Sequence, residues 1–362
     1  MKQQRSDSLW GRGRAVLAAL VLCHAWASDA DAEGAPAGAE GQPAGEAHLR
    51  NIRQLTFGGE NAEAYWSSDG KQLILQSTRD SLGCDQIFVM NADGSNPHMV
   101  STGKGRTTCA YFFPDGKRIL YASTHAASPD CPPAPDFSKG YVWKLYPSYD
   151  LFTADPDGSN LSRLTMTEGY DAEATIAPDG SRILFTSERD GDLDVYSMRL
   201  DGTDVRRLTT GLGYDGGAFY SPDSKRIVWR ASRPQSAEDK AAYTALLREH
   251  TIRPGALEIY TANADGSAVR QLTQNGAANF CPFFFPDGKR IIFASNMANP
   301  EGRNFDLWMM QIDGSGLEQV TFDPTFDGFP MLSPDGKRLV FASNRNSQGR
   351  RDTNVFIADW IE

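Results

Sequence analysis

The chain repeats one pattern of apolar and polar positions six times. An apolar run, a Pro-Asp-Gly type of turn, a basic pair and a second apolar run follow one another, as in FCPFFFPDGKRIIFAS (280–295) and GFPMLSPDGKRLVFAS (328–343). The turn Asp stands at positions 69, 115, 179, 223, 287 and 335, which gives spacings of 46, 64, 44, 64 and 48 residues. A unit of about 44 residues with two insertions of about 20 residues fits these spacings, and this period indicates stacked copies of one supersecondary unit.

Each repeat is predicted to contain four strands. Pro, Asp and Gly favour a tight hairpin between the first two strands, and a second turn such as DGS (313–315) precedes a fourth strand. The second strands are apolar on both faces, so both faces need cover, as in sheets packed around an axis. The predicted fold is therefore an all-β, six-bladed β-propeller. The second strands are Ile119–Ala122, Ile183–Thr186, Ile227–Trp229, Ile291–Ala294 and Leu339–Ala342.

The two ends of the repeat region complement each other. The last repeat ends after its third strand, NVFIADW, whereas the region begins with NIRQLTFG, which matches the fourth strands VRRLTTG and VRQLTQN. We expect Ile52–Thr56 to complete the last blade and close the ring, which leaves no open sheet edge.

The N-terminal part differs from the repeats. Residues 1–14 carry four basic residues and one acidic residue, and the apolar run AVLAALVLCHAWA follows. This pattern predicts a signal peptide (1–27) cut after Ala27, then a flexible linker (28–50) and the propeller (51–362). A lipoprotein anchored at Cys23 is the alternative, although Leu22 stands where a small residue is expected. The protein is therefore expected to be periplasmic or secreted, and not membrane-spanning.

Charge and cysteine content restrict the partners and the covalent links. Loss of residues 1–27 removes four positive charges and one negative charge, and changes the net charge from −10 to −13. Without a basic patch, nucleic acid is not an expected partner. Four cysteines remain after cleavage, and Cys109–Cys131 is the first disulfide to consider. Cys109 and Cys281 hold the same position in opposite blades, which places them too far apart for a disulfide.

Two aligned positions predict a polar ring at the mouth of the central channel. Every blade with Asp eight residues before the turn Asp has Arg ten residues after it, which predicts ion pairs within blades. The ring could bind an ion or an anionic ligand, or each pair could only orient its own hairpin. The expected ring consists of Asn61, Thr107, Asp171, Asp215, Asn279 and Asp327 with His125, Arg189, Arg233 and Arg345.

Two carboxylates lie two residues deeper than this ring. Glu63 and Glu173, with Asn61 and Asp171, could hold a divalent cation, because hard cations prefer carboxylate and amide oxygens. The sequence thus allows a metal-dependent hydrolase or lyase at the channel mouth. Without such a metal, no cofactor is expected.

Both insertions are expected on the same face as this ring. The first insertion (Ser128–Pro147) is rich in proline and aromatic residues. The second (Gln235 to about Pro254) predicts a helix with Ser236 as N-cap, which Pro254 and Gly255 end. The insertions either pack on the top surface or form a recognition surface. Their candidate contact residues are Phe137, Tyr141, Trp143, Tyr146, Arg248 and His250.

The repeats SPDGKRLVFASNR and NADGSAVRQLT resemble those of the TolB family over residues 51–360. The resemblance is to the C-terminal propeller of that family, and the α/β domain that precedes it there has no expected counterpart here. TolB is a component of the Tol–Pal envelope system, and the resemblance implies a six-bladed propeller in the periplasm that acts by binding proteins. Related repeats accompany the serine hydrolase domain of prolyl oligopeptidases, but no Gly-x-Ser-x-Gly occurs here. Oligogalacturonate lyases use a His-rich metal site, for which His125 and His250 are too few.

These observations favour a binding scaffold over an enzyme. We expect a monomer whose partner is an envelope or cell-surface protein.

Overall fold

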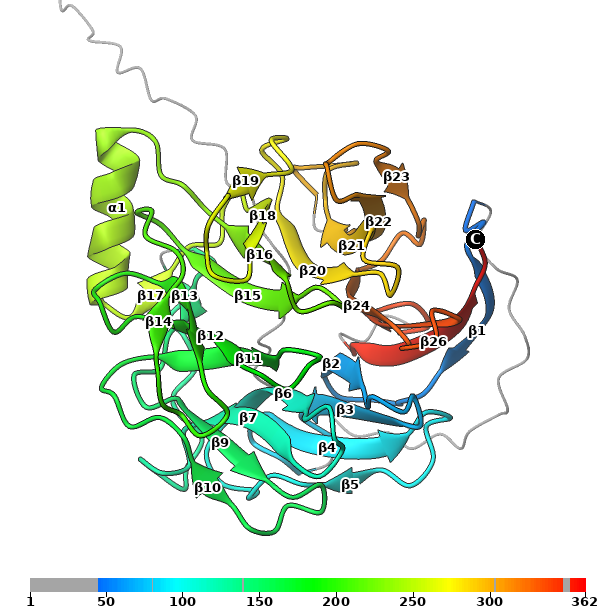
Figure 1. Ribbon diagram of the computed structural model, residues 1–362, viewed down its shortest axis with the longest axis horizontal. Coiled ribbons are helices and arrows are strands. Elements are labelled where there is room, and N and C mark those ends of the chain that lie inside the picture. The colour runs from blue at the N-terminus through cyan, green and yellow to red at the C-terminus, as the bar shows by residue number, and fades with distance from the viewer. Residues whose placement is uncertain (1–44, 80, 139, 303, 348–351) are drawn as a thin grey trace, which may run out of the picture.

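A computed structural model describes residues 45–79, 81–138, 140–302, 304–347 and 352–362. The expected signal peptide and most of the expected linker lie outside these residues. Six four-stranded antiparallel sheets surround a central axis, which confirms the six-bladed propeller (Figure 1).

The first three blades follow the order of the chain. Blade one contains β2 (Asn61–Trp66), β3 (Gln72–Ser77), β4 (Gln86–Asn91) and β5 (His98–Met99). Blade two contains β6 (Thr107–Phe112), β7 (Ile119–Ser123), β9 (Asp150–Ala154) and β10 (Ser162–Arg163). Blade three contains β11 (Asp171–Ile176), β12 (Ile183–Ser187), β13 (Asp194–Met198) and β14 (Arg206–Arg207).

The other three blades complete the ring. Blade four contains β15 (Asp215–Tyr220), β16 (Arg226–Ala231), β18 (Glu258–Asn263) and β19 (Arg270–Gln271). Blade five contains β20 (Asn279–Phe284), β21 (Arg290–Ser295), β22 (Asp306–Gln311) and β23 (Glu318–Gln319). Blade six contains β24 (Asp327–Leu332), β25 (Arg338–Ser343), β26 (Asn354–Trp360) and the N-terminal strand β1 (Leu49–Gln54).

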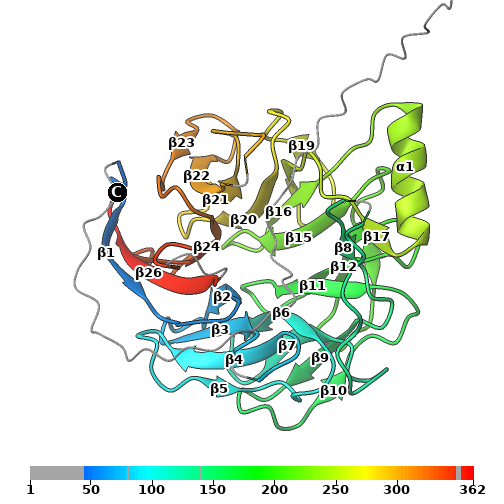
Figure 2. The same ribbon diagram turned by 180° about the vertical axis from the view of Figure 1, so that it is seen from behind.

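The N-terminal strand closes the ring as the sequence predicts. β1 pairs antiparallel with β26, with Leu49 opposite Trp360 (Figure 2). β1 begins at Leu49, two residues before the expected start of the propeller, and Glu46 is already buried. The Glu46 carboxylate reaches Arg345 of blade six at 3.1 Å. The closure therefore combines strand pairing, apolar burial and an ion pair.

The core lies between the faces of neighbouring sheets. The second strands are buried along their length, because each is covered on both sides by adjacent blades. The expected turns form between the first two strands, with Gly70 at φ 67° and Gly336 at φ 71° in the left-handed region. Ser224 takes this position in blade four at φ 59°.

The two insertions pair with each other. Strand β8 (Trp143–Lys144) of the first insertion forms a two-stranded antiparallel sheet with β17 (Thr251–Ile252) of the second. Helix α1 (Ala237–Arg248) precedes β17, and its N-cap Ser236 forms the expected capping box with Asp239. No helix in the described ranges is long and apolar enough to cross a membrane.

Candidate functional site

Every inner strand carries a β-bulge at the same position. The register between the first two strands of each blade shifts there, and the residue six positions before the turn Asp has a positive φ. This conformation is unfavourable for residues other than Gly, and such strain is concentrated at functional sites. All six residues line a small pocket of about 30 Å³, and four of them also line the larger cavity described below. We call them the bulge ring: Glu63 (52°), Cys109 (51°), Glu173 (55°), Gly217 (59°), Cys281 (53°) and Phe329 (53°).

Aromatic side chains close the channel beneath the bulge ring. Tyr65 of blade one contacts Phe219 of blade four, on the opposite side, with ring centroids 5.6 Å apart. Tyr111 and Phe283 contact the same Phe219 at 6.2 and 5.3 Å. The space above is therefore a pocket with a floor.

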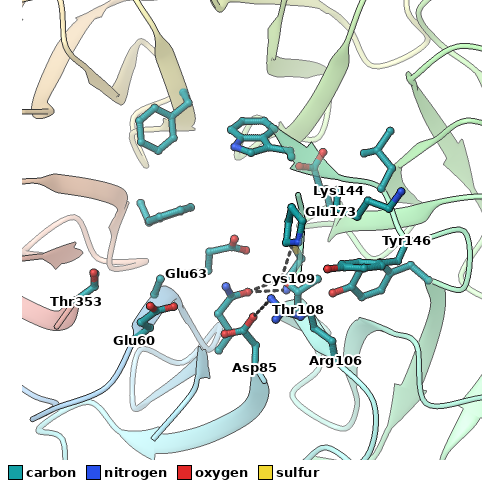
Figure 3. Close-up of a pocket in the computed structure, with 18 of the residues that line it drawn as sticks. Glu60, Glu63, Asp85, Arg106, Thr108, Cys109, Lys144, Tyr146, Glu173 and Thr353 are labelled. Atoms are coloured by element: carbon teal, nitrogen blue, oxygen red, sulfur yellow. Dashed lines mark hydrogen bonds and ion pairs between the residues drawn. The ribbon is translucent and has the colours of Figure 1, made fainter. Parts of the chain in front are cut away.

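The cavity above this floor has a volume of about 230 Å³ (Figure 3). Its wall contains nine aromatic side chains, from several blades and from the first insertion. Drug-sized ligands occupy pockets of about 300–1,000 Å³, so this cavity suits a smaller group. The aromatic lining residues are Tyr141, Trp143, Tyr146, Tyr149, Tyr170, Tyr214, Phe280, Phe326 and Phe329.

The first insertion forms the roof of the cavity. Trp143 lies edge-on to Tyr214 with centroids 5.8 Å apart, and its Nε1 donates to the Tyr141 hydroxyl at 3.1 Å. The hydroxyl of the buried Tyr146 donates to the Pro133 carbonyl at 2.7 Å. The roof is therefore fixed by packing, by hydrogen bonds and by the pairing of β8 with β17.

A disulfide attaches this roof to blade one. Cys84 and Cys131 are bonded, with Cα atoms 5.9 Å apart, whereas Cys109 and Cys281 are free. The predicted Cys109–Cys131 bond is wrong, because the bulge directs Cys109 toward the axis while Cys131 lies under the loop before β4.

A buried ion pair occupies one side of the cavity. Arg230 Nη2 lies 2.5 Å from Glu173 Oε1, and the guanidinium also stacks over the rings of Trp143 and Tyr214. Glu173 accepts further bonds from the Tyr214 hydroxyl, the Thr186 hydroxyl and the Gly217 amide. The hydrogen-bonding capacity of this carboxylate is thus already in use.

A second pair lies beside the first insertion. Arg106 Nη1 donates to Asp85 Oδ2 at 3.0 Å, and both side chains are largely buried. Burial raises the pKa of Asp85, whereas the Arg106 charge lowers it. As with Arg230 and Glu173, the opposite charges are matched inside the protein.

Glu63 differs from these two pairs. Its carboxyl extends from β2 toward the open space of the cavity (Figure 3). The Cys109 thiol is its hydrogen-bonding neighbour, and no ion pair forms on it within the described part of the chain. Burial raises the pKa of Glu63 to about 7, with Arg230 lowering it and Glu173 raising it. Glu63 is therefore the acceptor available to a ligand.

The predicted polar ring does not surround this cavity. The three expected ion pairs are confirmed, with Asp171–Arg189 at 2.9 Å, Asp215–Arg233 at 2.6 Å and Asp327–Arg345 at 2.8 Å. Their side chains do not line the cavity, because the sheets stand radially and strand faces point between blades. The other predicted ring residues are likewise absent from the cavity wall: Asn61, Thr107, His125 and Asn279.

The four residues proposed for a metal are separated by the same geometry. Glu63 and Glu173 line the cavity, whereas Asn61 accepts from Ser77 at 2.7 Å and Asp171 is paired with Arg189. Within the described residues, no group of three His, Cys, Asp or Glu side chains is arranged to hold a metal ion. The predicted divalent-cation set is not assembled.

The insertion residues divide between the cavity and the surface. Tyr141, Trp143 and Tyr146 line the cavity, so they face inward rather than forming an outer recognition surface. Phe137 is 37% exposed and stacks on Tyr141, and Arg248 is exposed on α1. The remaining candidate, His250, bonds through Nδ1 to Glu188 at 3.0 Å.

Sequence reasoning missed several lining residues. Arg230, Tyr214, Phe280 and Phe326 come from strands or loops whose inward direction depends on the bulge. The available signal was the column six residues before each turn Asp, which reads Glu, Cys, Glu, Gly, Cys and Phe. This column mixes charged, polar, small and aromatic residues, whereas the second strands are apolar at successive positions.

The fold and the cavity define a six-bladed propeller with a roofed central pocket. Residues 142–247 and 243–355 match the family described as the TolB beta propeller domain (PD40), which together is more than half of the chain. The chain belongs to this family.

Curated relatives match over a shorter stretch. The Tol-Pal system protein TolB of Bordetella pertussis is 27% identical over 145 residues, which is 31% of this chain and 31% of that protein. The protein of Bordetella bronchiseptica gives the same values. The match therefore spans about a third of the length of these relatives.

Solved structures share the fold at low sequence identity. A TolB structure from Agrobacterium tumefaciens has a TM-score of 0.55 at 20% identity, and covers 86% of this chain and 97% of that chain. A TolB from Acinetobacter baumannii has a TM-score of 0.52 at 20% identity, and the match covers 83% of this chain and 63% of that chain. An oligogalacturonate lyase in complex with manganese has a TM-score of 0.51 at 16% identity, and the match covers 89% of this chain and 95% of that chain. TolB proteins and a lyase thus share this architecture.

Proposed function

We propose that this chain is an exported TolB-like propeller that acts as a non-catalytic binding protein in the cell envelope. In this proposal, a segment of a partner protein enters the cavity beneath the roof. The observation that carries it is the arrangement of the cavity: an aromatic wall from several blades and from the first insertion, closed below by the contact between Tyr65 and Phe219.

The charged groups of the cavity favour binding over catalysis. Glu173 and Asp85 are already matched to arginines, and burial raises the pKa of the Cys109 thiol well above its usual range. A thiol in this state is a poor nucleophile at neutral pH. The predicted metal set, which was the basis for the enzyme, is not formed.

Export and the partner rest on the sequence and on the family. The pattern of residues 1–27 supports a secretory signal, and the TolB relatives are named as proteins of the Tol-Pal system. We propose an envelope or cell-surface protein as partner, and a monomeric propeller as the binding unit.

Two aromatic residues of the first insertion separate the cavity from the outer surface. Trp143 lines the cavity, whereas Phe137 lies outside it and is 37% exposed. In affinity capture from envelope extracts, Trp143→Ala is expected to lose the partner that the unmodified chain retains, and Phe137→Ala to keep it. Loss with Phe137→Ala alone would contradict the proposal and place recognition on the outer face. Circular dichroism should show intact blades in both variants.

A further inference from the structure

Two ion pairs match four of the charged side chains that line the cavity. Arg230 pairs with Glu173 at 2.5 Å and Arg106 with Asp85 at 3.0 Å. Glu63 has no ion-pair partner in the described part of the chain, although it lies in the same enclosed space. A partly buried carboxylate without a counter-charge is costly, so a cationic ligand would be stabilised there.

The remaining lysine of the cavity is engaged elsewhere. Lys144 Nζ donates to the Glu249 carbonyl at 2.7 Å, at the exposed edge of the roof. This bond holds its charge at the end of α1 rather than beside Glu63. Among the described residues, Arg230 is the cation that acts on Glu63, and its ion pair is formed with Glu173. Two carboxylates therefore share one guanidinium on this side of the cavity.

The wall of the cavity fits a cation with an apolar stem. Aromatic faces attract ammonium groups, and methylene groups pack well against them. Phe280, Phe326 and Trp143 line the space into which Glu63 extends. A carboxylate among aromatic side chains is the combination that recognises alkylammonium groups.

The volume of the cavity and its closed end restrict the class of ligand further. The volume of about 230 Å³ is small, and the contact between Tyr65 and Phe219 closes the far end. Because Glu63 lies near this closed end, a ligand reaches it with its charged end first. A single long side chain meets these conditions.

We propose, building on the function proposed above, that the cavity binds the lysine side chain of a partner segment. Its ammonium donates to Glu63, and its methylene stem lies between the aromatic walls. The bulge that places Glu63 on the axis is thus part of the recognition site.

The test uses the full chain and defined probes. Saturation-transfer NMR would compare acetyl-Gly-Lys-Gly-amide with the same peptide carrying norleucine, which has a similar stem without the charge. We expect at least tenfold weaker binding of the norleucine peptide. Equal binding of the two peptides, or no binding of the lysine peptide, would overturn the proposal. Butylamine binding as tightly as the lysine peptide would overturn the assignment to a partner segment in favour of a free amine.

Glu63→Gln is the matched variant, because it keeps the shape and removes the charge. We expect at least tenfold weaker binding of the lysine peptide, whereas Glu60→Gln, at another point of the same cavity, should change it less than threefold. A larger loss with Glu60→Gln would overturn the role of Glu63. If partner capture depends on Trp143 but the lysine peptide does not bind, only this inference fails and the binding function stands.

The pH dependence gives a second readout. Glu63 faces the Cys109 thiol, the Arg230 guanidinium and the carboxylates of Glu173 and Asp85. Because burial holds the pKa of Glu63 near 7, its charge is lost below neutrality. Affinity for the lysine peptide should rise between pH 6 and 8 in the unmodified chain and stay flat in Glu63→Gln. A rise of the same size in both would overturn the assignment.

Discussion

Closure of the ring through the N-terminal strand can be tested with one side chain. Leu49 is fully buried in β1, packs in the main core and lies opposite Trp360 of β26. Leu49→Ala removes apolar contacts and leaves a cavity that the flanking sheets cannot fill completely. Buried Leu→Ala substitutions cost about 2–5 kcal/mol, so we expect a loss of free energy of unfolding in that range.

The control lies in the same segment. Phe57 is 77% exposed, so Phe57→Ala should change the free energy of unfolding by less than about 0.5 kcal/mol. Denaturant titration followed by tryptophan fluorescence measures both variants. Equal midpoints for the two variants would refute the closure. Deletion of residues 45–54, which also removes the Glu46–Arg345 pair, should be more damaging than Leu49→Ala.

Further predictions concern a buried acid and the roof. Burial, with the nearby Asp327 carboxylate, raises the pKa of Asp306 to about 7. The native state therefore holds a proton that the unfolded chain releases, and stability from this group falls as pH rises from about 4 to 7. Asp306→Asn should remove this slope and add about 1–3 kcal/mol at pH 8, and an unchanged slope in denaturant titrations would contradict it. Cys84→Ser with Cys131→Ser frees the roof from blade one. Hydrogen exchange around Trp143 should then accelerate while the blades keep their protection, and unchanged exchange would show that β8 and β17 alone hold the roof.

The sequence was sufficient to predict the architecture, because each repeat contains the turn and strand patterns of one blade. The turn at Asp287, the buried second strand Arg290–Ser295 and the complementary ends together define blades and closure. The Asp–Arg pairs were also predictable, because each pair lies within one hairpin. The pairing of two adjacent strands brings the two positions together without any contact to other blades. In these cases the sequence pattern within one repeat determines the structure of that repeat.

The cavity was less predictable because it depends on departures from regular strands. At Glu63 the backbone takes a positive φ and the pairing register between β2 and β3 shifts, and the regular period of a strand does not predict such a departure. The partner of Cys131 depends on which blade the first insertion crosses, and spacing along the chain does not determine that. Likewise, the helix was readable from its capping box, but the pairing of β8 with β17 is a tertiary contact.

We propose that a partner binds in the roofed cavity. Photo-crosslinking in intact cells tests it directly, with p-benzoylphenylalanine placed at Phe326 in the cavity wall or at Val269, which is 54% exposed outside it. The account predicts that Phe326 captures one envelope protein through a lysine-containing segment, identified by mass spectrometry, and that Val269 does not. Capture of the same protein from Val269, with none from Phe326, would contradict the account.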